Sequence, residues 1–283
     1  MELQAALQCL HLYSPAPLEA ARFYRDTYGM TLEPVGGGAG GETYVCRAPG
    51  RQLMLSTGPA NQLNYAHFGF HEDAAWKAFS ARFEGRALEP LPPALRQLAR
   101  AGGAVSLRDP DGNNIVFTGP VDSDMAAPPG LPPAKLQHFA LRTPQLDAML
   151  DYYTRELGFV LSDAVRDEDG ALRACFLRSN SLHHALALFF APATCFDHQS
   201  FEAPDWASMQ VWGDHMAKQR VPIVWGIGRH GPGNDVFFMV RDPDGNLAEI
   251  SAEIEHCESG RQAGLWPHEA RTLNLWGEAF LRT

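Results

Sequence analysis

The chain has 283 residues, 45% of them apolar, and a formal net charge of −10. This length allows about two domains of roughly 150 residues each, with enough apolar side chains for two cores. The sequence has no Lys/Arg run of the kind that binds a phosphate backbone, and no stretch near the roughly 18 unbroken apolar residues of a membrane span, so we expect neither a nucleic-acid partner nor a membrane segment.

Five scattered cysteines never form a C-x-x-C pair, which disfavours a disulfide framework and a zinc knuckle. The opening segment, MELQAALQCLHLYSP, has no basic region before an apolar run, so we expect a cytoplasmic protein. The negative charge points to a small-molecule partner. It leaves an anionic substrate open, because Arg142, Arg229 or Arg241 could provide positive charge inside a cleft.

The predicted elements begin with a strand, LQCLHLYSP, followed by PLEAARFYRDTYG, in which apolar residues have helical spacing up to a C-terminal Gly29. Several short strands follow. The segment LRDPDGNNIVF then contains the Pro and Asp-Gly of a tight turn before a final strand. The same order recurs as LQHFALRTP, as PQLDAMLDYYTRELG with Gly158, and as VRDPDGNLAEI. The chain is therefore an internal duplication.

Five prolines between Gly119 and Lys135 mark a linker between the two copies. We predict an N-terminal domain (1–119), a linker (120–134), a C-terminal domain (135–253) and a tail (254–283). A further helical segment, DWASMQVWGDHMAKQ, suggests that each domain contains two β-α-β-β-β modules, an α+β fold. Because the tail is rich in large apolar residues, we expect it to pack on the second domain or on a neighbouring subunit and to help close the mouth of the site.

Only the second copy carries three possible metal ligands. The candidates His138, His198 and Glu249 correspond to Cys9, Tyr65 and Val116 of the first copy. Two neutral imidazoles and a carboxylate form the facial triad of non-haem iron enzymes, whereas a structural zinc site would more often use thiolates. Singly, each histidine could be an ordinary core residue and the glutamate an ion-paired one. Together they predict a metal centre in the second domain and none in the first.

This order of elements, with the RDPDGN turn before the last strand, resembles the glyoxalase/bleomycin-resistance/dioxygenase (vicinal oxygen chelate) superfamily over nearly all of residues 1–253. Within it, the sequence is similar to the type I extradiol catechol dioxygenases. The resemblance implies an open barrel in each domain, Fe(II) with Mn(II) as an alternative, O2 and a small aromatic substrate, a role in aromatic catabolism, and a homo-oligomer. In this family, glyoxalase sites take ligands from both halves of a paired barrel. Because the first copy lacks the three candidate ligands, a glyoxalase-like site is disfavoured.

The resemblance also implies roles for further residues. His184 aligns with the acid–base histidine of these enzymes, with His183 expected on the opposite strand face, and His230 aligns with the histidine that hydrogen-bonds the bound catecholate. The implied substrate-contacting residues are Phe176, Phe190, Asn234, Asp235, Met239 and Ala140. Plainer readings are a core position for His184, a solvated loop for His230 and turn-forming roles for Asn234 and Asp235.

One residue departs from the family pattern. Nine residues after His230, where the extradiol enzymes have a tyrosine, this sequence has Met239. A thioether has no proton to donate. The leading hypothesis is therefore an extradiol dioxygenase, with two alternatives left open. One is another metal-dependent reaction on the same fold, such as aminophenol or hydroquinone cleavage, a lyase or an isomerase. The other is a metal-free protein that binds a small flat ligand.

Overall fold

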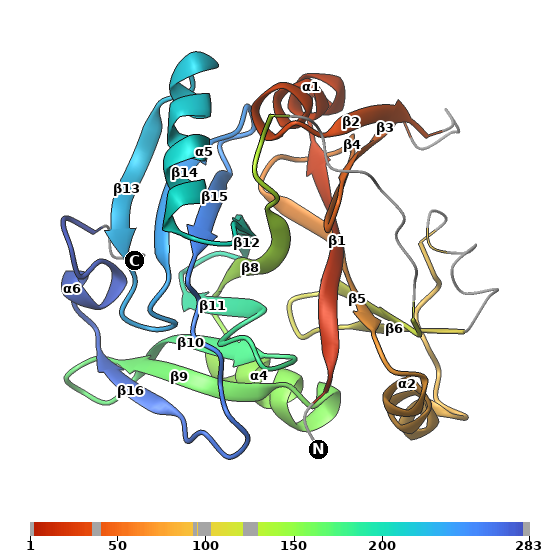
Figure 1. Cartoon of the computed structure of the whole chain (residues 1–283). Coiled ribbons are helices and arrows are strands. Elements are labelled where there is room, and N and C mark those ends of the chain that lie inside the picture. The colour runs from red at the N-terminus through yellow and green to blue at the C-terminus, as the bar shows by residue number, and fades with distance from the viewer. Residues whose placement is uncertain (1–2, 36–40, 93–94, 96–102, 121–129, 280–283) are drawn as a thin grey trace.

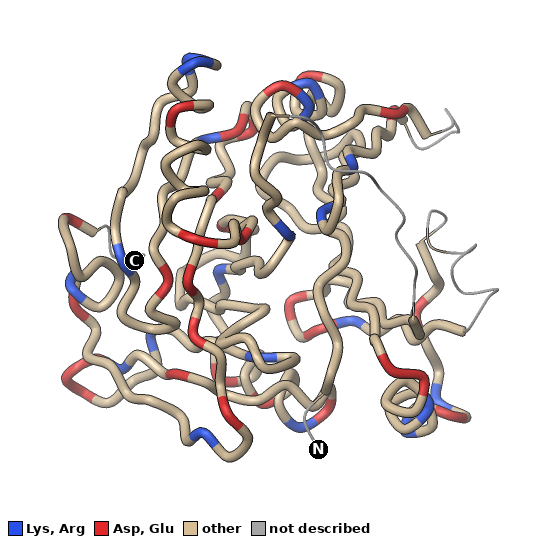
Figure 2. Tube along the Cα trace, in the orientation of Figure 1, with Lys and Arg blue, Asp and Glu red and all other residues tan. Residues whose placement is uncertain are grey.

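The computed structural model describes residues 3–35, 41–92, 95, 103–120 and 130–279. These residues form two twisted β-sheets, one from each half of the chain (Figure 1). Among them, no helix is both long and apolar enough to cross a bilayer. Lys and Arg are interspersed with Asp and Glu along the described chain, without a basic run (Figure 2). All five cysteines are free.

The first half forms a seven-stranded sheet with the strand order β2-β3-β4-β1-β5-β7-β6. Its elements are β1 (Ala5–Ser14), α1 (Pro17–Tyr28), β2 (Thr31–Pro34), β3 (Thr43–Ala48), β4 (Arg51–Thr57), β5 (Gln62–Phe70), α2 (Asp73–Ser80), a 3-10 turn (Ala81–Phe83), β6 (Ala104–Arg108) and β7 (Asn114–Thr118). The first module has the predicted β-α-β-β-β order. The second shows β5, α2, β6 and β7, one strand fewer within the described residues.

The second half forms a nine-stranded sheet with the order β13-β14-β15-β12-β8-β11-β10-β9-β16. Its elements are β8 (Lys135–Thr143), α4 (Leu146–Asp151), a π-helical turn (Tyr152–Leu157), β9 (Val160–Arg166), β10 (Leu172–Arg178), β11 (Leu186–Phe190), β12 (Cys195–Glu202), α5 (Trp206–Lys218), β13 (Ile223–Arg229), β14 (Val236–Arg241), β15 (Leu247–Ala252), β16 (Gly264–Pro267) and α6 (Ala270–Leu273). Both modules here have the predicted order.

The predicted α+β fold with a repeated module order is confirmed, and the repeat extends to strand pairing. In the first half β1 lies between β4 (parallel) and β5 (antiparallel); in the second, β8 lies between β11 (parallel) and β12 (antiparallel). Gly29 and Gly158 end the equivalent helical segments with φ values of 60° and 89°, a left-handed conformation that glycine adopts at little cost. Most of the predicted linker, residues 121–129, lies outside the described residues.

Two equivalent tyrosines join the halves. The Tyr24 hydroxyl on α1 donates to Asp242 Oδ2 at 2.8 Å, and the Tyr153 hydroxyl donates to Asp109 Oδ2 at 3.0 Å. Each aspartate belongs to the RDPDGN turn of the other half, where its Oδ1 also accepts backbone N–H groups. Each helix is therefore bound to the turn of the opposite copy, and one continuous apolar core runs through both halves.

Candidate metal centre and cavity

The three predicted ligands lie on three neighbouring strands of the second sheet. His138 is on β8, His198 on the adjacent β12 and Glu249 on β15, the next strand along. Ser200 of β12 pairs with both His138 and Glu249. Side chains that project from one face of adjacent strands converge, and here they bring together residues that lie far apart in the sequence.

The ligand atoms of this triad, His138, His198 and Glu249, face one another in the protein interior. The two Nε2 atoms lie 3.2 Å apart, and His138 Nε2 lies 3.7 Å from Glu249 Oε1. All three residues are buried, with Glu249 fully inaccessible. One ligand atom from each residue lies within 4.8 Å of the others. Two imidazole nitrogens and a carboxylate oxygen at these separations fit a divalent metal ion, which would compensate the burial of the carboxylate.

The Nδ1 atoms of both triad histidines, His138 and His198, have hydrogen-bond partners. His198 Nδ1 lies 2.6 Å from Asp197 Oδ1, and His138 Nδ1 is hydrogen-bonded to Gln137 Oε1. Because these oxygens are acceptors, each Nδ1 carries the proton and each Nε2 keeps a lone pair for the metal. Ser200 Oγ similarly donates to Glu249 Oε1 at 2.6 Å.

Gln137 and Asp197 reach the histidines that follow them because each is the extra residue of a β-bulge. Along the β8–β12 ladder, the pairing shifts between Ser200 and Phe201 and between Phe196 and His198. Each shift leaves Gln137 or Asp197 without a partner in register and turns its side chain toward its neighbour. The β1–β5 ladder shifts between Leu7 and Cys9, so the bulge preceding the metal position recurs in the first half.

The electrostatics keep His138 and Glu249 in their ligand-binding forms. Burial lowers the pKa of His138 to about 3, so its imidazole is neutral near pH 7. Burial alone would raise the pKa of Glu249, but the hydrogen bond from His230 opposes it, and that pKa is lowered to about 2. The carboxylate is thus ionised at neutral pH.

A small cavity lies beside the triad and is lined by both of its histidines. Four histidines meet there: two triad histidines with His184 and His230. The remaining lining side chains are apolar, namely Phe176, Ala187, Phe189, Pro232, Met239 and Leu273. None of the lining residues in the described part of the chain is a lysine or an arginine. Arg142 instead bonds Asp197, and Arg229 bonds Glu253.

His184 lies where the resemblance implied, on the cavity wall, with its ring centroid 4.3 Å from that of His138. Burial lowers its pKa well below the usual value. The expectation for His183 is wrong. Both residues precede β11, which begins at Leu186, so strand alternation does not separate them. Their Nδ1 atoms instead lie 3.0 Å apart.

His230 also reaches the cavity, from the loop after β13. Its Nδ1 lies 2.6 Å from the Leu273 carbonyl oxygen, its Nε2 lies 3.5 Å from Glu249 Oε2, and its ring stacks on Phe237. Burial opposes protonation of His230, but the hydrogen bond with Glu249 and the nearby Asp235 raise its pKa. Asp235 lies behind His230, fully buried, and burial raises its own pKa to about 6.

Two of the six implied substrate-contacting residues do not face the cavity. Phe190 projects from the other face of β11, where Arg173 lies over its ring, and the preceding Phe189 lines the cavity instead. Asn234 is exposed and adopts φ 56°, the left-handed conformation of a turn. Sequence reasoning missed Phe189, Ala187 and Pro232.

The other four lie at or next to the cavity. Phe176 and Met239 line it, and Met239 pairs in register with Glu249. Ala140 is buried beside Ala187, which does line the cavity. Asp235 contributes a carboxylate within 4.8 Å of the ligand atoms of His230 and Glu249, without lining the cavity itself.

The equivalent place in the first half is apolar. Cys9, Tyr65 and Val116 come together there with Met54 and other buried side chains. The Tyr65 hydroxyl donates to Met54 Sδ at 2.8 Å. Among the described residues, no cluster of possible metal ligands occurs in this half. The duplicated position thus holds packed side chains instead of ligands.

The tail packs on the second half. Its strand β16 extends the second sheet by pairing with β9, and Leu273 at the end of α6 forms part of the cavity wall. Leu273 also supplies the carbonyl oxygen that fixes His230. Phe280, one of the large apolar residues of the tail that we expect to pack, lies outside the described residues with the rest of 280–283.

Comparisons with known proteins agree with this fold. Residues 135–250 match the model of the Glyoxalase/Bleomycin resistance protein/Dioxygenase superfamily. Metapyrocatechase 2 of Cupriavidus necator is 29% identical, covering 88% of this chain and 81% of the relative. Biphenyl-2,3-diol 1,2-dioxygenase 3 of Rhodococcus globerulus is 32% identical, covering 52% and 77%. The structure of homoprotocatechuate 2,3-dioxygenase from Arthrobacter globiformis shares the fold with a TM-score of 0.76, 20% identity and coverage of 98% and 88%.

Proposed function

The chain belongs to the Glyoxalase/Bleomycin resistance protein/Dioxygenase superfamily, and on that basis we propose that it is an extradiol dioxygenase that opens catechol-type rings with O2. One observation carries the assignment to this site. In the triad of His138, His198 and Glu249, both histidines line the cavity with their Nδ1 atoms already hydrogen-bonded, and two further histidines stand on the same cavity wall. Two predictions stay predictions: a cytoplasmic location and a homo-oligomer.

We propose that the triad holds Fe(II), with Mn(II) as the alternative. When bound, such an ion supplies open coordination positions for the two hydroxyl oxygens of a catechol and for O2. The residues of the chain fix its place. Asp197 and Gln137 orient the imidazoles, and Ser200 orients the carboxylate.

The two remaining histidines handle protons in this proposal. His184, kept neutral by burial, can take a proton from a catechol hydroxyl and return it as the ring opens. His230, whose pKa is raised, can donate a hydrogen bond to the substrate oxygen that becomes anionic. Met239 takes no part in proton transfer, because a thioether has no donor. Its side chain instead adds apolar surface where a tyrosine would place a hydroxyl.

The lining also limits the substrate. Beyond the histidines, the described wall consists of Phe, Ala, Pro, Met and Leu, with no cation to bind a carboxylate. We therefore propose that the ring carries apolar substituents. Burying a carboxylate here without a partner would cost several kcal/mol, on the order of what separates a good substrate from a poor one.

Oxygen consumption by the Fe(II)-loaded full chain tests the function. We expect O2 uptake and a coloured ring-opened product with 3-methylcatechol, and much lower kcat/KM with the carboxylated homoprotocatechuate. Alanine at any triad position should abolish bound metal and turnover while the protein stays folded, whereas Cys9→Ala, the matched change in the first half, should keep both. Full metal content and turnover in two of the three triad variants would refute the assignment.

A further inference from the structure

His184 has a partner behind the cavity. His183, fully buried and absent from the cavity wall, places its Nδ1 3.0 Å from His184 Nδ1. Two ring nitrogens at this distance share one proton, so one donates and the other accepts. The Phe176 ring lies against both imidazoles and limits their rotation. Whichever group fixes the proton of His183 therefore also fixes that of His184.

Two carboxylates face the other nitrogen of His183. Its Nε2 lies 3.3 Å from Asp163 Oδ2 and 4.0 Å from Glu255 Oε2, without a well-aligned hydrogen bond to either. Although burial raises the pKa of Asp163, contacts with His183, Trp266 and Arg261 hold it below its usual value, so the carboxyl is ionised. Facing two acceptors, Nε2 carries the proton of a neutral His183, and Nδ1 keeps a lone pair.

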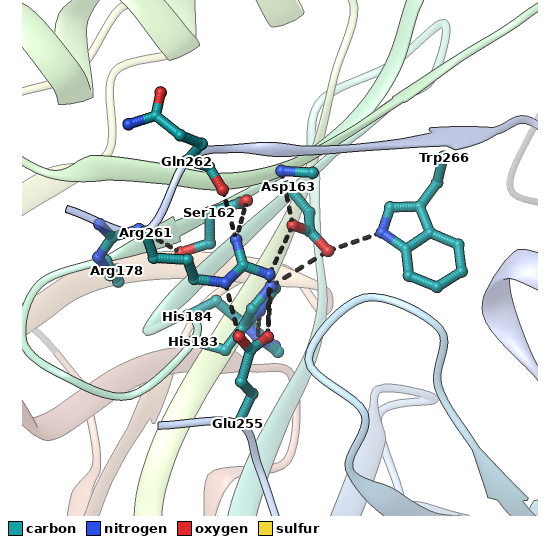
Figure 3. A network of polar contacts seen from close by, with 10 residues as sticks. Ser162, Asp163, Arg178, His183, His184, Glu255, Arg261, Gln262 and Trp266 are labelled. Carbon is teal, nitrogen blue, oxygen red and sulfur yellow. Dashed lines mark hydrogen bonds and ion pairs between the residues drawn. The ribbon is translucent and has the colours of Figure 1, made fainter. Parts of the chain in front are cut away.

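The tail fixes these carboxylates (Figure 3). Arg261 binds Glu255 through two nitrogens at 2.6 and 2.9 Å and Asp163 at 3.0 Å. Trp266 Nε1 donates to Asp163 Oδ2 at 2.7 Å, and the Gly264 N–H donates to Oδ1 at 3.1 Å. A Cβ at Gly264 would lie 2.5 Å from Asp163 Oδ1, so this close approach requires glycine.

We propose that His183 and Asp163, held by Arg261 and Trp266 of the tail, are positioning residues that keep His184 in the tautomer with its proton on Nδ1. In this arrangement His184 Nδ1–H donates to His183, and its Nε2 has a lone pair that can accept a substrate proton. The catalytic meaning rests on the proposed function, but the tautomer does not. The network contacts the His184 ring through His183, which makes this residue the point to perturb.

The tautomer can be measured without turnover. In the full chain loaded with diamagnetic zinc, long-range proton–nitrogen correlation spectra distinguish the protonated from the bare nitrogen of each ring. We expect His184 protonated at Nδ1 and His183 at Nε2, with the His184 signals identified by their loss in His184→Gln. A proton on His184 Nε2 would overturn the proposal.

Kinetics with matched variants test the consequence. His183→Asn keeps an acceptor near the position of Nδ1, whereas His183→Gln keeps one only near Nε2. If His183 positions His184, the Asn variant retains most of kcat and the Gln variant loses about a hundredfold or more, because a positioned acid–base group contributes about 10²–10⁴-fold. KM and bound iron should change in neither. Equal kcat in both variants would assign His183 a packing role and overturn the proposal.

The tail contribution has its own pair of variants. Trp266→Phe removes only the N–H that binds Asp163, and Trp276→Phe is the control, since Trp276 contacts Arg229 and Trp206 instead. We expect lower kcat at unchanged iron content in the first variant alone. Wild-type kcat in Trp266→Phe would refute the role of the tail. If the wild-type chain consumed no O2 with any catechol, the proposed function would fail, and the spectra would still decide the tautomer.

Discussion

Replacing Asp197 by Asn should weaken metal binding without unfolding the protein. The Asp197 carboxylate is fully buried and accepts two charge-assisted hydrogen bonds of 2.6 Å, from Arg142 Nε and His198 Nδ1. An amide of the same shape offers one acceptor and one donor. If its oxygen faces Arg142, its NH2 group meets His198 Nδ1 and favours the tautomer with a proton on Nε2, which cannot bind a metal. If its oxygen faces His198, a donor meets the guanidinium.

The expected loss is 10- to 100-fold in metal affinity, on the order of 1.4 to 2.8 kcal/mol, as found for changes to groups that orient metal-bound histidines. Anaerobic Fe(II) titration against a chelator measures the dissociation constant, and thermal unfolding checks the fold. Asp167→Asn is the control, because that carboxylate caps the turn between β9 and β10 and does not line the cavity. A dissociation constant within twofold of wild type in Asp197→Asn would refute the argument.

Three further outcomes are expected. Tyr65→Phe should leave one metal per chain, and a second site titrating in the first half would contradict this. Leu273→Ala should raise KM several-fold through loss of cavity wall, with unchanged metal content; unchanged KM would exclude Leu273 from substrate binding. Burial lowers the pKa of both His11 and His67 to about 4. Both histidines stay neutral in the folded protein, whereas in the unfolded chain they take up protons below about pH 6.5. Their contribution to the free energy of unfolding is therefore fully present above that pH and is lost as the pH falls toward 4. At pH 5 each histidine should lower the free energy of unfolding by about 2 kcal/mol. In a denaturation series from pH 7 to 5, the free energy of unfolding should therefore fall less steeply in His11→Gln or His67→Gln than in the wild type; parallel curves would contradict this.

The features that follow from the internal repeat can be predicted from the sequence, whereas those that depend on strand register cannot. The duplicated segments predict the module order, the helix ends at Gly29 and Gly158, and the contrast between a copy with metal ligands and a copy without them. Phe190 was misplaced because the phase of β11 was unknown, and a shift of one residue exchanges the two faces of a strand. The roles of Gln137 and Asp197 depend on bulges that alternation cannot reveal. A usable signal existed, because Gln137 has an identical counterpart, Gln8, in the first copy.

Two tyrosines of α1 show that the first half, which has no metal ligands, supports the metal site of the second half. Besides the bond from Tyr24 to Asp242, the Tyr28 hydroxyl donates to the backbone oxygen of Ala248 at 3.1 Å, one residue before Glu249. The strand that presents the carboxylate is therefore braced by a helix from the other copy. The first copy therefore supports the site without metal ligands of its own, through the contact of its helix with this strand. Cutting the chain at the linker should thus yield two unstable pieces, not a smaller working enzyme.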